Sequence, residues 1–469
     1  MALPKLIPNG KNELLLKFHF SGICGAGMGN VALLLREAGH QVKGSDANTY
    51  PPMSTQLEEA GILLFDGYGP ERLNERFVPD VQVISNVLSK DHPEVLAGVE
   101  AGIESLSFPQ VLEQFILPGR VPYVVAGTHG KTTTASLLSQ LLKEEGAGYF
   151  LGGILKDGSS GIHLGREGAP FVMEGDEYDT AYFDKHSKFL HYRPKVLILT
   201  HLEWDHVDIF PTFEDMLSEF RALIALLPED GLLVYCGDHE VLRELAENFS
   251  GKKVSYGLGR MNDVYLEKVE KKDGLNSLSL GGPLGGIKLE TPLIGKIYHL
   301  NAMAAFLAAN LGGGYPSEAL VERLSLQRGA KRRLEVLKPE PNLVISDFAH
   351  HPTAVKETLE ICRESHPELK LVAVFDPRNA TSRRSVFEER MSEALGLADR
   401  VILAPVHQDH RLNPEERLDG DRLASRIGGK ARAHVESEEF LQDVLNSISA
   451  ENLVLIMSCG ACHGLFDEL

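Results

Sequence analysis

The sequence has no long apolar run, few cysteines and a shortage of positive charge. Its 469 residues include 5 cysteines, and 47 Lys and Arg stand against 66 Asp and Glu, which leaves a net charge of −19. This acidic balance argues against nucleic acid and anionic membrane as partners. The apolar runs are short and interrupted, so we expect no membrane span. The N-terminus lacks the basic, apolar and small-residue regions of a signal peptide, and we therefore expect a cytoplasmic protein.

The cysteines predict no disulfide scaffold, because an odd and sparse set does not suit one in a long chain. Cys459 and Cys462 stand in the pattern CGACH, which is typical of c-type haem attachment. Haem attachment requires export, and one cysteine pair supplies too few ligands for a structural zinc site. We interpret the motif as a coincidence within a C-terminal strand and turn.

Strand, glycine-rich turn and helix follow one another repeatedly, which predicts an α/β protein with parallel sheets. The first such unit has a strand at 17–22, a turn at 23–30 and a helix at 31–40, and a second unit starts at 121. The length suggests about three domains of ~150 residues each.

Pro and Gly punctuate the chain at 117–120, and we expect a second hinge within the glycine-rich stretch 312–329. An alternating stretch with several Gly at 262–289 predicts an antiparallel accessory patch. The third domain is expected to begin near Lys331.

The most specific motif is GTHGKTTT at 127–134, between a predicted strand and a predicted helix. In such a loop, backbone N–H groups and the helix N-terminus attract phosphate oxygens. Lys131 would reach the β- and γ-phosphates, and the Thr132 hydroxyl would bind Mg²⁺. The loop is a shortened Walker motif, because Val125 stands where the full pattern has glycine. A plain turn with a capping threonine is the alternative, but the order of strand, loop and helix favours nucleotide binding.

Two acidic segments also follow predicted strands, EGDEYD at 174–179 and EWDHVD at 203–208. Clustered carboxylates suit Mg²⁺, because hard cations prefer oxygen ligands. Each segment alone could be a solvated loop. In open α/β sheets, however, the carboxyl ends of the strands converge on the ligand crevice. We therefore expect both segments to belong to the phosphate site.

The N-terminal loop GICGAGMG at 22–29 resembles a dinucleotide-binding loop, and Asp46 follows at a suitable distance, at the end of the next strand. The last glycine of the strict pattern is missing. Because such a loop fits any diphosphate, including that of a UDP-sugar, an NAD-dependent dehydrogenase and a UDP-sugar sensor remain rival hypotheses.

Two further segments carry polar groups in the last third of the chain. DFAHHPT at 347–353 puts two histidines at a strand-to-helix junction, and DPRNATSRR at 376–384 gathers donors suited to carboxylates or phosphates. A structural histidine and a solvated basic helix start are the alternatives. GAKRRLE at 329–335 is either a binding segment or a charged linker.

Together these segments resemble the Mur ligase family, the ATP-dependent amide-forming enzymes of peptidoglycan synthesis. The resemblance runs from about His19 to Leu465. It implies an α/β fold of three domains: a Rossmann-like N-terminal domain that binds a UDP-sugar (14–118), a central P-loop ATPase-like domain with a mostly parallel sheet (119–325) and a Rossmann-like C-terminal domain for the incoming amine (326–469).

Within the family, EGDEYDTAYFDKHSKFLHYRPK, GAKRRLEVL and DFAHHPTAV resemble the branch that acts in peptidoglycan recycling. That branch joins UDP-N-acetylmuramate to the murein tripeptide L-alanyl-γ-D-glutamyl-meso-diaminopimelate. The alternative branch adds L-alanine alone. It usually has Tyr-Gly where this chain has Phe348 and Ala349, and His-Arg where this chain has Arg378 and Asn379. The implied mechanism uses ATP and Mg²⁺ and passes through an acyl phosphate.

The resemblance also implies the roles of individual residues. The catalytic residues would be Lys131, Glu174, His206 and His350. The Mg²⁺ ligands would be Thr132, Glu174 and His206. The ATP contacts would come from Gly127, Thr128, His129, Gly130, Lys131, Thr132, Thr133, Asn301 and Arg332, with Arg333 beside the last. The contacts with UDP-N-acetylmuramate and the amine substrate would come from Gly25, Ala26, Gly27, Met28, Asp46, Arg378, Thr381 and Arg383.

The chain departs from the family pattern at two places. The family usually has His-Asn near the adenine, but Ile297 and Tyr298 occupy those positions here, and only Asn301 fits. Several sister enzymes carry a carbamylated lysine after the histidine motif. The segment 211–228 contains no lysine, so we expect no carbamate in this chain.

Overall fold

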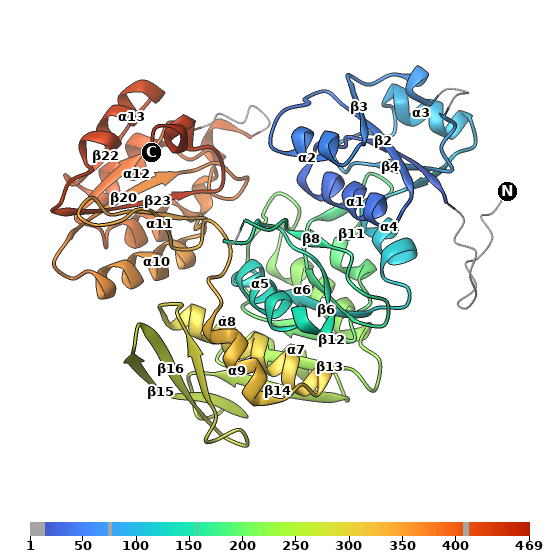
Figure 1. Cartoon of the computed structure of the whole chain (residues 1–469). Helices are drawn as coiled ribbons and strands as arrows, with labels where there is room; N and C mark the ends of the chain where they lie inside the picture. Colours follow the sequence, from blue (N-terminus) through green and yellow to red (C-terminus); the bar gives the residue numbers. More distant parts are fainter. Residues whose placement is uncertain (1–14, 74–76, 157, 407–411) are drawn as a thin grey trace. The chain divides into compact units, whose positions relative to one another are not determined.

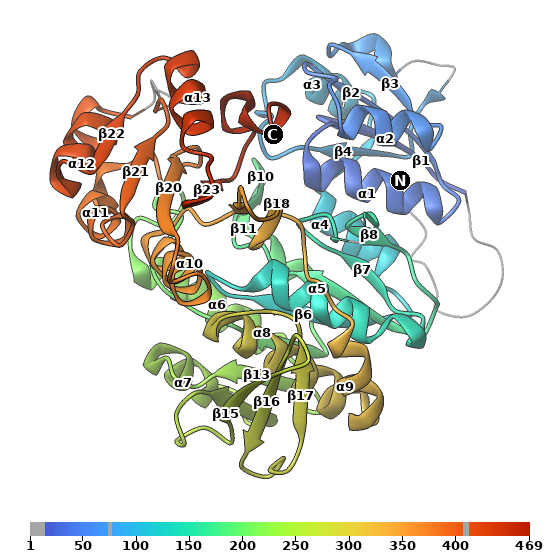
Figure 2. The same ribbon diagram turned by 60° about the vertical axis from the view of Figure 1, so that its left-hand side comes forward.

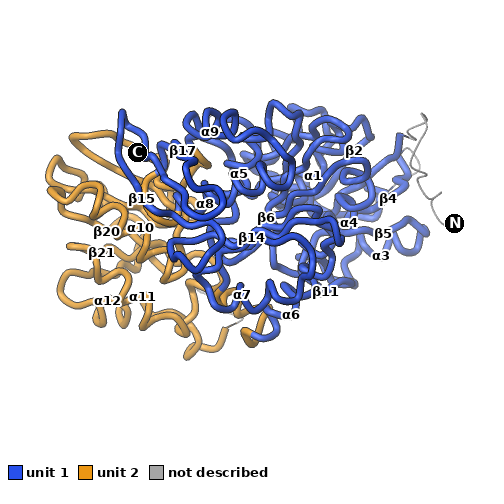
Figure 3. The backbone as a smooth tube through the Cα atoms, turned by 90° about the horizontal axis from the view of Figure 1, so that it is seen from below, with its two compact units in different colours: residues 1–202, 214–293, 298–328 blue, residues 203–213, 294–297, 329–469 orange. Residues whose placement is uncertain are grey.

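The computed structural model describes residues 15–73, 77–156, 158–406 and 412–469. Contacts between Cα atoms divide the chain into two compact units (Figure 3). Unit 1 comprises residues 1–202, 214–293 and 298–328, and unit 2 comprises residues 203–213, 294–297 and 329–469. Each unit has its own sheet or sheets. Across the described ranges, no helix combines the length and the apolar character needed to cross a membrane.

The first sheet of unit 1 is parallel throughout, with the strand order β3-β2-β1-β4-β5. It is drawn in shades of blue in Figure 1. Its strands are β1 (Lys17–Ser21), β2 (Gln41–Asp46), β3 (Leu63–Asp66), β4 (Val81–Ile84) and β5 (Glu104–Leu106). The helices between and after them are α1 (Ala26–Glu37), α2 (Met53–Glu59), η1 (Pro70–Leu73), α3 (Pro93–Glu100), α4 (Phe108–Val111) and η3 (Leu112–Ile116). Phe18 and Phe20 of the central strand β1 are fully buried, as expected for a parallel strand covered on both faces.

The second sheet of unit 1 has the order β17-β16-β15-β14-β13-β12-β6-β9-β7-β8. Its strands are β6 (Val121–Ala126), β7 (Gly148–Phe150), β8 (Ile162–His163), β9 (Pro170–Glu174), β12 (Val196–Leu199), β13 (Leu232–Cys236), β14 (Lys252–Gly257), β15 (Val264–Lys272), β16 (Leu275–Gly281) and β17 (Lys288–Thr291). Strands β10 (Asp179–Ala181) and β11 (Asp184–Ser187) form a separate antiparallel hairpin. The associated helices are α5 (Lys131–Leu141), η4 (Lys143–Glu145), η5 (Lys188–His191), α6 (Phe213–Ala225), α7 (Glu240–Glu247), α8 (Lys296–Leu307), η6 (Ala308–Gly312) and α9 (Ser317–Ser325).

The antiparallel stretch expected at 262–289 is part of this large sheet and does not form a separate patch. Strands β15, β16 and β17 lie side by side and pair antiparallel (Figure 2). Strand β15 also pairs parallel with β14, at Tyr256 and Gly257. The sheet is therefore mostly parallel in its middle and antiparallel at both edges, since β7 and β8 also pair antiparallel.

Polar contacts join the two sheets of unit 1. Glu113 of η3 accepts a hydrogen bond from the Arg193 guanidinium, and one of its carboxylate oxygens lies 2.8 Å from His191 Nδ1. Glu37 at the end of α1 accepts from the backbone N–H of Leu164 at 3.2 Å with each carboxylate oxygen. These contacts hold α1 and η3 against the segments around β8 and η5.

Unit 2 contains a sheet of order β18-β19-β23-β20-β21-β22, parallel except at the β18 edge. Its strands are β18 (Glu335–Lys338), β19 (Val344–Asp347), β20 (Lys370–Asp376), β21 (Arg400–Leu403), β22 (Ala431–Ala433) and β23 (Asn452–Ser458). Its helices are α10 (Pro352–Ser365), η7 (Ser385–Phe387), α11 (Glu388–Leu395), η8 (Pro414–Glu416), α12 (Gly420–Ile427), α13 (Ser437–Asn446) and η9 (Cys462–Asp467). Alternate residues of β20 belong to two cores, with Ala373 and Phe375 in one and Val372 and Val374 in the other, because successive strand residues point to opposite faces.

The predicted α/β class with mostly parallel sheets is confirmed, but the bounds of one expected turn are wrong. The turn expected at 23–30 is shorter, because α1 already begins at Ala26. Gly27 and Gly29 lie inside this helix. Glycine suits these positions because a Cβ at residue 27 would come within 3.0 Å of the Phe108 ring, and a Cβ at residue 29 within 2.2 Å of Met53 Sδ. The stretch 312–329, expected to carry the second hinge, includes α9, whose Leu320 and Leu324 are buried four residues apart on one face, and the division between the two units falls at its end, between Arg328 and Gly329.

The buried core of β20 predicts a large effect of truncating Phe375. Phe375→Ala should destabilise unit 2 by about 3–5 kcal/mol, because it removes a ring and leaves a cavity. Leu397→Ala is the matched control, since Leu397 is 41% exposed. Guanidinium unfolding followed by circular dichroism measures both variants. Equal unfolding midpoints for the two variants would contradict this packing.

Candidate active site

The predicted phosphate loop, residues 127–130, connects the end of β6 to the start of α5. Gly127 and Gly130 have φ angles of 129° and 82°, which glycine adopts without steric cost. A Cβ on Gly127 would come within 2.5 Å of the His201 carbonyl oxygen, and a Cβ on Gly130 within 2.6 Å of Asn301 Oδ1. Both positions therefore require glycine. Asn301 of α8, predicted to contact ATP, lies directly against the loop.

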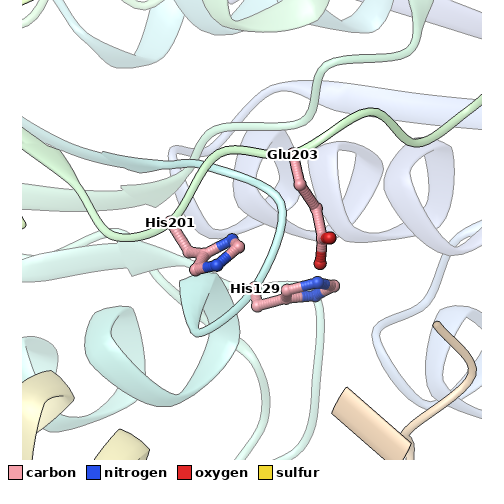
Figure 4. A group of neighbouring side chains, drawn as sticks. All are labelled: His129, His201 and Glu203. Atoms are coloured by element: carbon pink, nitrogen blue, oxygen red, sulfur yellow. The ribbon is translucent and has the colours of Figure 1, made fainter. Parts of the chain in front are cut away.

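The neighbouring strand β12 supports this loop from one side. The Thr128 N–H donates to the His201 carbonyl oxygen at 2.7 Å, and the Thr200 hydroxyl donates to the carbonyl oxygens of Ala126 and His129. The imidazoles of His129 and His201 lie beside each other with ring centroids 5.1 Å apart (Figure 4). Glu203 follows His201 by two residues along the chain. The strand end and the loop are thus one hydrogen-bonded structure.

Lys131, the first residue of α5, is held by a partner that the sequence analysis did not assign. Its Nζ lies 2.8 Å from Glu177 Oε1 and donates to the Gly127 carbonyl oxygen at 2.6 Å. Burial by itself would lower the pKa of Lys131, but the carboxylates of Glu177, Glu174 and Asp176 together outweigh this effect and raise the pKa above its usual value. Lys131 is therefore a positive charge at the start of the helix. Glu177 stands in the acidic segment 174–179, but that segment does not single it out from the neighbouring carboxylates.

A second contact, between Thr132 and Glu174, lies directly after the loop, in the first turn of α5. The Thr132 hydroxyl donates to Glu174 Oε1 at 2.8 Å, and Glu174 Oε2 accepts from the Gly152 N–H at 2.9 Å. A hydroxyl and a carboxylate that face each other are two oxygen donors of the kind that a hard cation takes. The predicted ligands Thr132 and Glu174 therefore fit Mg²⁺. Glu174 reaches this position because β9 pairs with β6, with Glu174 opposite Val125.

The other carboxylates of the acidic segment pair with lysines. Asp176 Oδ2 lies 2.6 Å from Lys188 Nζ, and Asp179 Oδ2 lies 2.8 Å from Lys185 Nζ. Asp179 thus ties β10 to β11 of the hairpin, and Asp176 ties the segment to the start of η5. Glu174 and Glu177 are the members of the segment that contact the phosphate loop.

The N-terminal loop presents backbone more than side chains. Gly25 and Ala26 are exposed, whereas the side chain of Met28 is buried in the core. Asp46 Oδ2 accepts from the Cys24 N–H at 2.9 Å. Of the predicted substrate residues, Gly25 and Ala26 are the ones open at the surface of unit 1. Asp46 is joined to the same loop.

His206 lies in unit 2, in a strained segment. Its φ is 52°, an uncommon value for a residue with a side chain, and its N–H donates to Asp205 Oδ1 at 2.7 Å. The same oxygen accepts from the Thr381 hydroxyl at 2.6 Å. Burial would raise the pKa of Asp205, but His206, His350, His351 and the Thr381 hydrogen bond together lower it. Thr381, predicted to contact the amine substrate, therefore binds the segment that carries His206.

Glu203 anchors the start of this segment within unit 2. Its Oε2 accepts from the Thr353 hydroxyl and from Arg390, each at 3.0 Å. Its Oε1 lies 3.1 Å from His351 Nδ1. The second histidine of the predicted pair thus contacts a carboxylate and is completely buried, which leaves His350 as the more accessible of the two.

His350 lines a small cavity of unit 2. The hollow has room for about one water molecule, and its lining includes His350, Thr381, Ser382 and Glu388. Among the described residues that line it, neither Arg378 nor Arg383 is present. The Arg378 side chain packs over Gly460, and Arg383 Nε donates to the Asn379 carbonyl oxygen at 3.2 Å. Of the predicted amine-site residues, the structure therefore brings His350 and Thr381 together.

Arg332, predicted to contact ATP, is engaged with the backbone of unit 2. Its guanidinium donates to the carbonyl oxygens of Ser458 and Gly460 at 2.9 and 2.6 Å, and it lies 4.6 Å from the centre of the Phe466 ring. Arg333 lies over the Phe348 ring at 4.8 Å. Arg332 thereby fixes the segment entering β18 to the end of β23.

The two cysteines of the CGACH motif are free thiols at the end of β23. Cys462 is completely buried in the core, and burial raises the pKa of its thiol well above the usual range. A protonated, buried thiol is a poor nucleophile and a poor metal ligand.

Three family models match consecutive parts of the chain. The model described as "Mur ligase family, catalytic domain" matches residues 17–119, the "Mur ligase middle domain" matches residues 125–309, and the "Mur ligase, glutamate ligase domain" matches residues 332–460. The matches cover most of the chain, including the phosphate loop and both acidic segments.

Individual proteins match over similar lengths. The UDP-N-acetylmuramate–L-alanyl-γ-D-glutamyl-meso-2,6-diaminoheptandioate ligase of Escherichia coli is 37% identical over 84% of this chain and 86% of the relative. The UDP-N-acetylmuramate–L-alanine ligase of Kineococcus radiotolerans is 33% identical over 95% and 93%, respectively. The crystal structure of a murein peptide ligase from Psychrobacter arcticus superimposes with a TM-score of 0.73 at 29% identity, covering 97% of this chain and 98% of that one. From these matches we conclude that the chain belongs to the Mur ligase family of ATP-dependent ligases.

Proposed function

We propose that this chain joins UDP-N-acetylmuramate to the tripeptide L-alanyl-γ-D-glutamyl-meso-diaminopimelate, with conversion of ATP to ADP and phosphate, in peptidoglycan recycling. The observation that carries the chemistry is the phosphate loop, in which Lys131 and Thr132 start α5 and face Glu177 and Glu174 at 2.8 Å. The tripeptide is supported by the 37% identity to the Escherichia coli ligase named for it. We place the reaction in the cytoplasm, where ATP is available.

We assign one task to each predicted domain. Residues 14–118 would bind the UDP-sugar, residues 119–325 would bind ATP, and residues 326–469 would bind the amine. The exposed backbone at Gly25 and Ala26 supports the first task, because N–H groups at a helix start attract a diphosphate. The position of His350 and Thr381 beside the same small hollow of unit 2 supports the last.

In this mechanism the lactyl carboxylate of the muramate attacks the γ-phosphorus of ATP, which forms an acyl phosphate and releases ADP. The uncharged amine of the tripeptide then attacks the acyl carbon, phosphate leaves with the bonding electrons, and the nitrogen loses a proton. Lys131 would exchange its contact with Glu177 for the phosphate oxygens and stabilise their charge. Mg²⁺, held by Thr132 and Glu174 and by the predicted ligand His206, would neutralise the transferring phosphoryl group.

The alternative is the addition of L-alanine alone. The Kineococcus ligase named for that reaction is 33% identical to this chain, so the identities alone separate the two reactions only slightly. Phe348 and Ala349, where the alanine branch usually has Tyr-Gly, favour the tripeptide. In the structure Phe348 contacts both Arg333 and His350, so this position borders the cavity residue His350.

The first test concerns Lys131. Lys131→Ala should reduce ligation by at least about a thousandfold, since it removes the charge that faces the γ-phosphate. It should leave the Kd for UDP-N-acetylmuramate unchanged, because the N-terminal loop is a separate structure. Coupled ADP release measures the rate, and calorimetry measures the Kd.

Lys131→Ala leaves Glu177 buried without its cation, so a stability control is needed. The double variant Lys131→Met/Glu177→Gln removes both charges together. It should unfold close to the wild-type temperature and remain inactive. Activity near the wild-type level in either variant would refute the role of Lys131.

The second test concerns the metal. Glu174→Gln should raise the Mg²⁺ concentration needed for half-maximal activity by about tenfold or more, because a neutral amide oxygen is a weaker ligand for a hard cation than a carboxylate. Asp179→Asn is the matched control in the same acidic segment, since Asp179 pairs with Lys185. Its Mg²⁺ requirement should equal that of the wild type. An unchanged Mg²⁺ titration of Glu174→Gln would exclude Glu174 as a ligand.

The third test separates the two acceptors. With UDP-N-acetylmuramate and ATP fixed, kcat/KM for the tripeptide should exceed that for L-alanine by at least about a hundredfold, because binding energy from the distal part of an acceptor lowers the barrier of the reacting centre. Steady-state kinetics with both acceptors in parallel measures the ratio. A ratio below one would establish the alternative reaction.

A further inference from the structure

A carboxylate in the N-terminal part of unit 1 contacts several strand ends, although no motif pointed to it. Glu94 is the second residue of α3, and its side chain is completely buried. Oε1 accepts from the hydroxyls of Ser21 and Ser45 at 2.6 and 2.5 Å and lies 2.8 Å from His19 Nε2. Oε2 accepts from the Gly69 N–H at 3.0 Å. One side chain thus links β1, β2, the loop after β3 and α3.

The ionisation of this cluster is consistent with its geometry. Burial by itself would raise the pKa of Glu94, but the contacts with His19, Ser21 and Ser45 outweigh it and lower the pKa to about 2. Burial lowers the pKa of His19. Glu94 is therefore an anion at neutral pH. Three of the four contacts converge on Oε1 and one reaches Oε2.

Ser45, which Glu94 contacts, also accepts backbone hydrogen bonds from the N-terminal loop. The N–H groups of Gly22 and Ile23 both donate to the Ser45 carbonyl oxygen, at 2.8 and 3.1 Å. The next residue, Cys24, donates to Asp46 at 2.9 Å. Ser45 and Asp46 are therefore the support of the loop that leads to Gly25. The Ser45 hydroxyl is fixed by Glu94.

We propose that Glu94 is a positioning residue for the nucleotide-sugar loop: it sets the spacing of the ends of β1 and β2 and thereby aims the backbone N–H groups at Gly25 and Ala26. This inference rests on the proposed function, because it takes the UDP-sugar as the ligand of that loop. Glu94 contacts no substrate itself. A preorganised loop binds a diphosphate without first having to become ordered. Loss of the Glu94 carboxylate therefore weakens the affinity for the nucleotide sugar specifically.

Glu94→Gln tests this role with little change of volume. An amide has one acceptor oxygen and a donor NH2. Either the Gly69 N–H then faces the NH2, or the hydroxyls of Ser21 and Ser45 and the His19 ring have to change from donors to acceptors. The Kd for UDP-N-acetylmuramate, measured by calorimetry without ATP, should rise about tenfold. The Kd for ATP and kcat at saturating substrates should stay within about twofold of the wild type. Ser45→Ala, a milder change, should raise the Kd for the sugar about threefold.

The matched control is Asp443→Asn in unit 2. Asp443 is also a largely buried carboxylate beside a histidine, with His434 Nε2 at 3.0 Å and an Arg400 nitrogen at 2.5 Å. Its loss should lower the thermal midpoint without changing the Kd for the sugar. A purely structural role of Glu94 predicts the same pattern for Glu94→Gln, so a folded variant with wild-type sugar affinity overturns the proposal. So does an equal loss of affinity for ATP.

The outcome for the wild type separates this proposal from the proposed function. If the wild type does not bind UDP-N-acetylmuramate, the proposed function fails. If the wild type binds the sugar and Glu94→Gln binds it equally well, only the role of Glu94 fails. If Glu94→Gln does not fold, Ser45→Ala decides, and unchanged sugar affinity in that variant overturns the proposal.

Discussion

Hydrogen-bonded pairing of β6 with β12 on one side and β9 on the other is the constraint on which the phosphate site depends. Val125 lies opposite Ile198 in β12 and opposite Glu174 in β9. The loop that follows β6 therefore starts beside both neighbouring strand ends. A slip of one residue would turn Glu174 to the other face of the sheet, away from Thr132. The position of the carboxylate is thus a property of the sheet register more than of the acidic segment.

The site concentrates charge that the chain as a whole does not have. A net charge of −19 repels a polyphosphate at long range, so attraction has to come from groups close to the ligand. In the proposed function, Lys131 and the N-terminus of α5 supply this attraction within one loop. Glu177 balances the buried lysine while no phosphate is present, which avoids the cost of an unpaired buried cation. Glu94 plays a comparable part around β1, where the carboxylate is balanced by donors instead of a full positive charge.

Much of the sheet architecture could be predicted from the sequence, because strand, glycine turn and helix alternate with clear periodicity. A strand was expected at 17–22 and β1 is found at 17–21, and β6 ends one residue before the expected loop. The start of α1 was missed, because glycines at 27 and 29 suggest a turn until their packing against Phe108 and Met53 is known. Such tertiary contacts leave no local signal in the chain.

The candidate site was predicted unevenly for the same reason. Lys131, Thr132 and Glu174 stand in motifs with a chemical meaning, and the structure places them together. Glu177 stood in a quoted segment, but nothing local distinguishes it from Asp176. The contact of Thr381 with Asp205 joins residues 176 positions apart, which only the fold can reveal. Short edge strands such as β18 and β22 were also missed, since three or four residues carry little periodicity.

The division of the chain has a consequence for how the molecule is made. Unit 2 takes residues 203–213 and 294–297 from within the stretches that build unit 1. Glu203 cannot meet Thr353 and Arg390 until the chain has emerged from the ribosome well beyond Arg390. During synthesis, residues 203–213 therefore stay without these contacts until the later part of the chain has been made. A fragment that ends near residue 329 would contain residues 203–213 but lack their partners in unit 2. Both units are discontinuous in sequence, so they cannot fold one after the other as independent consecutive domains.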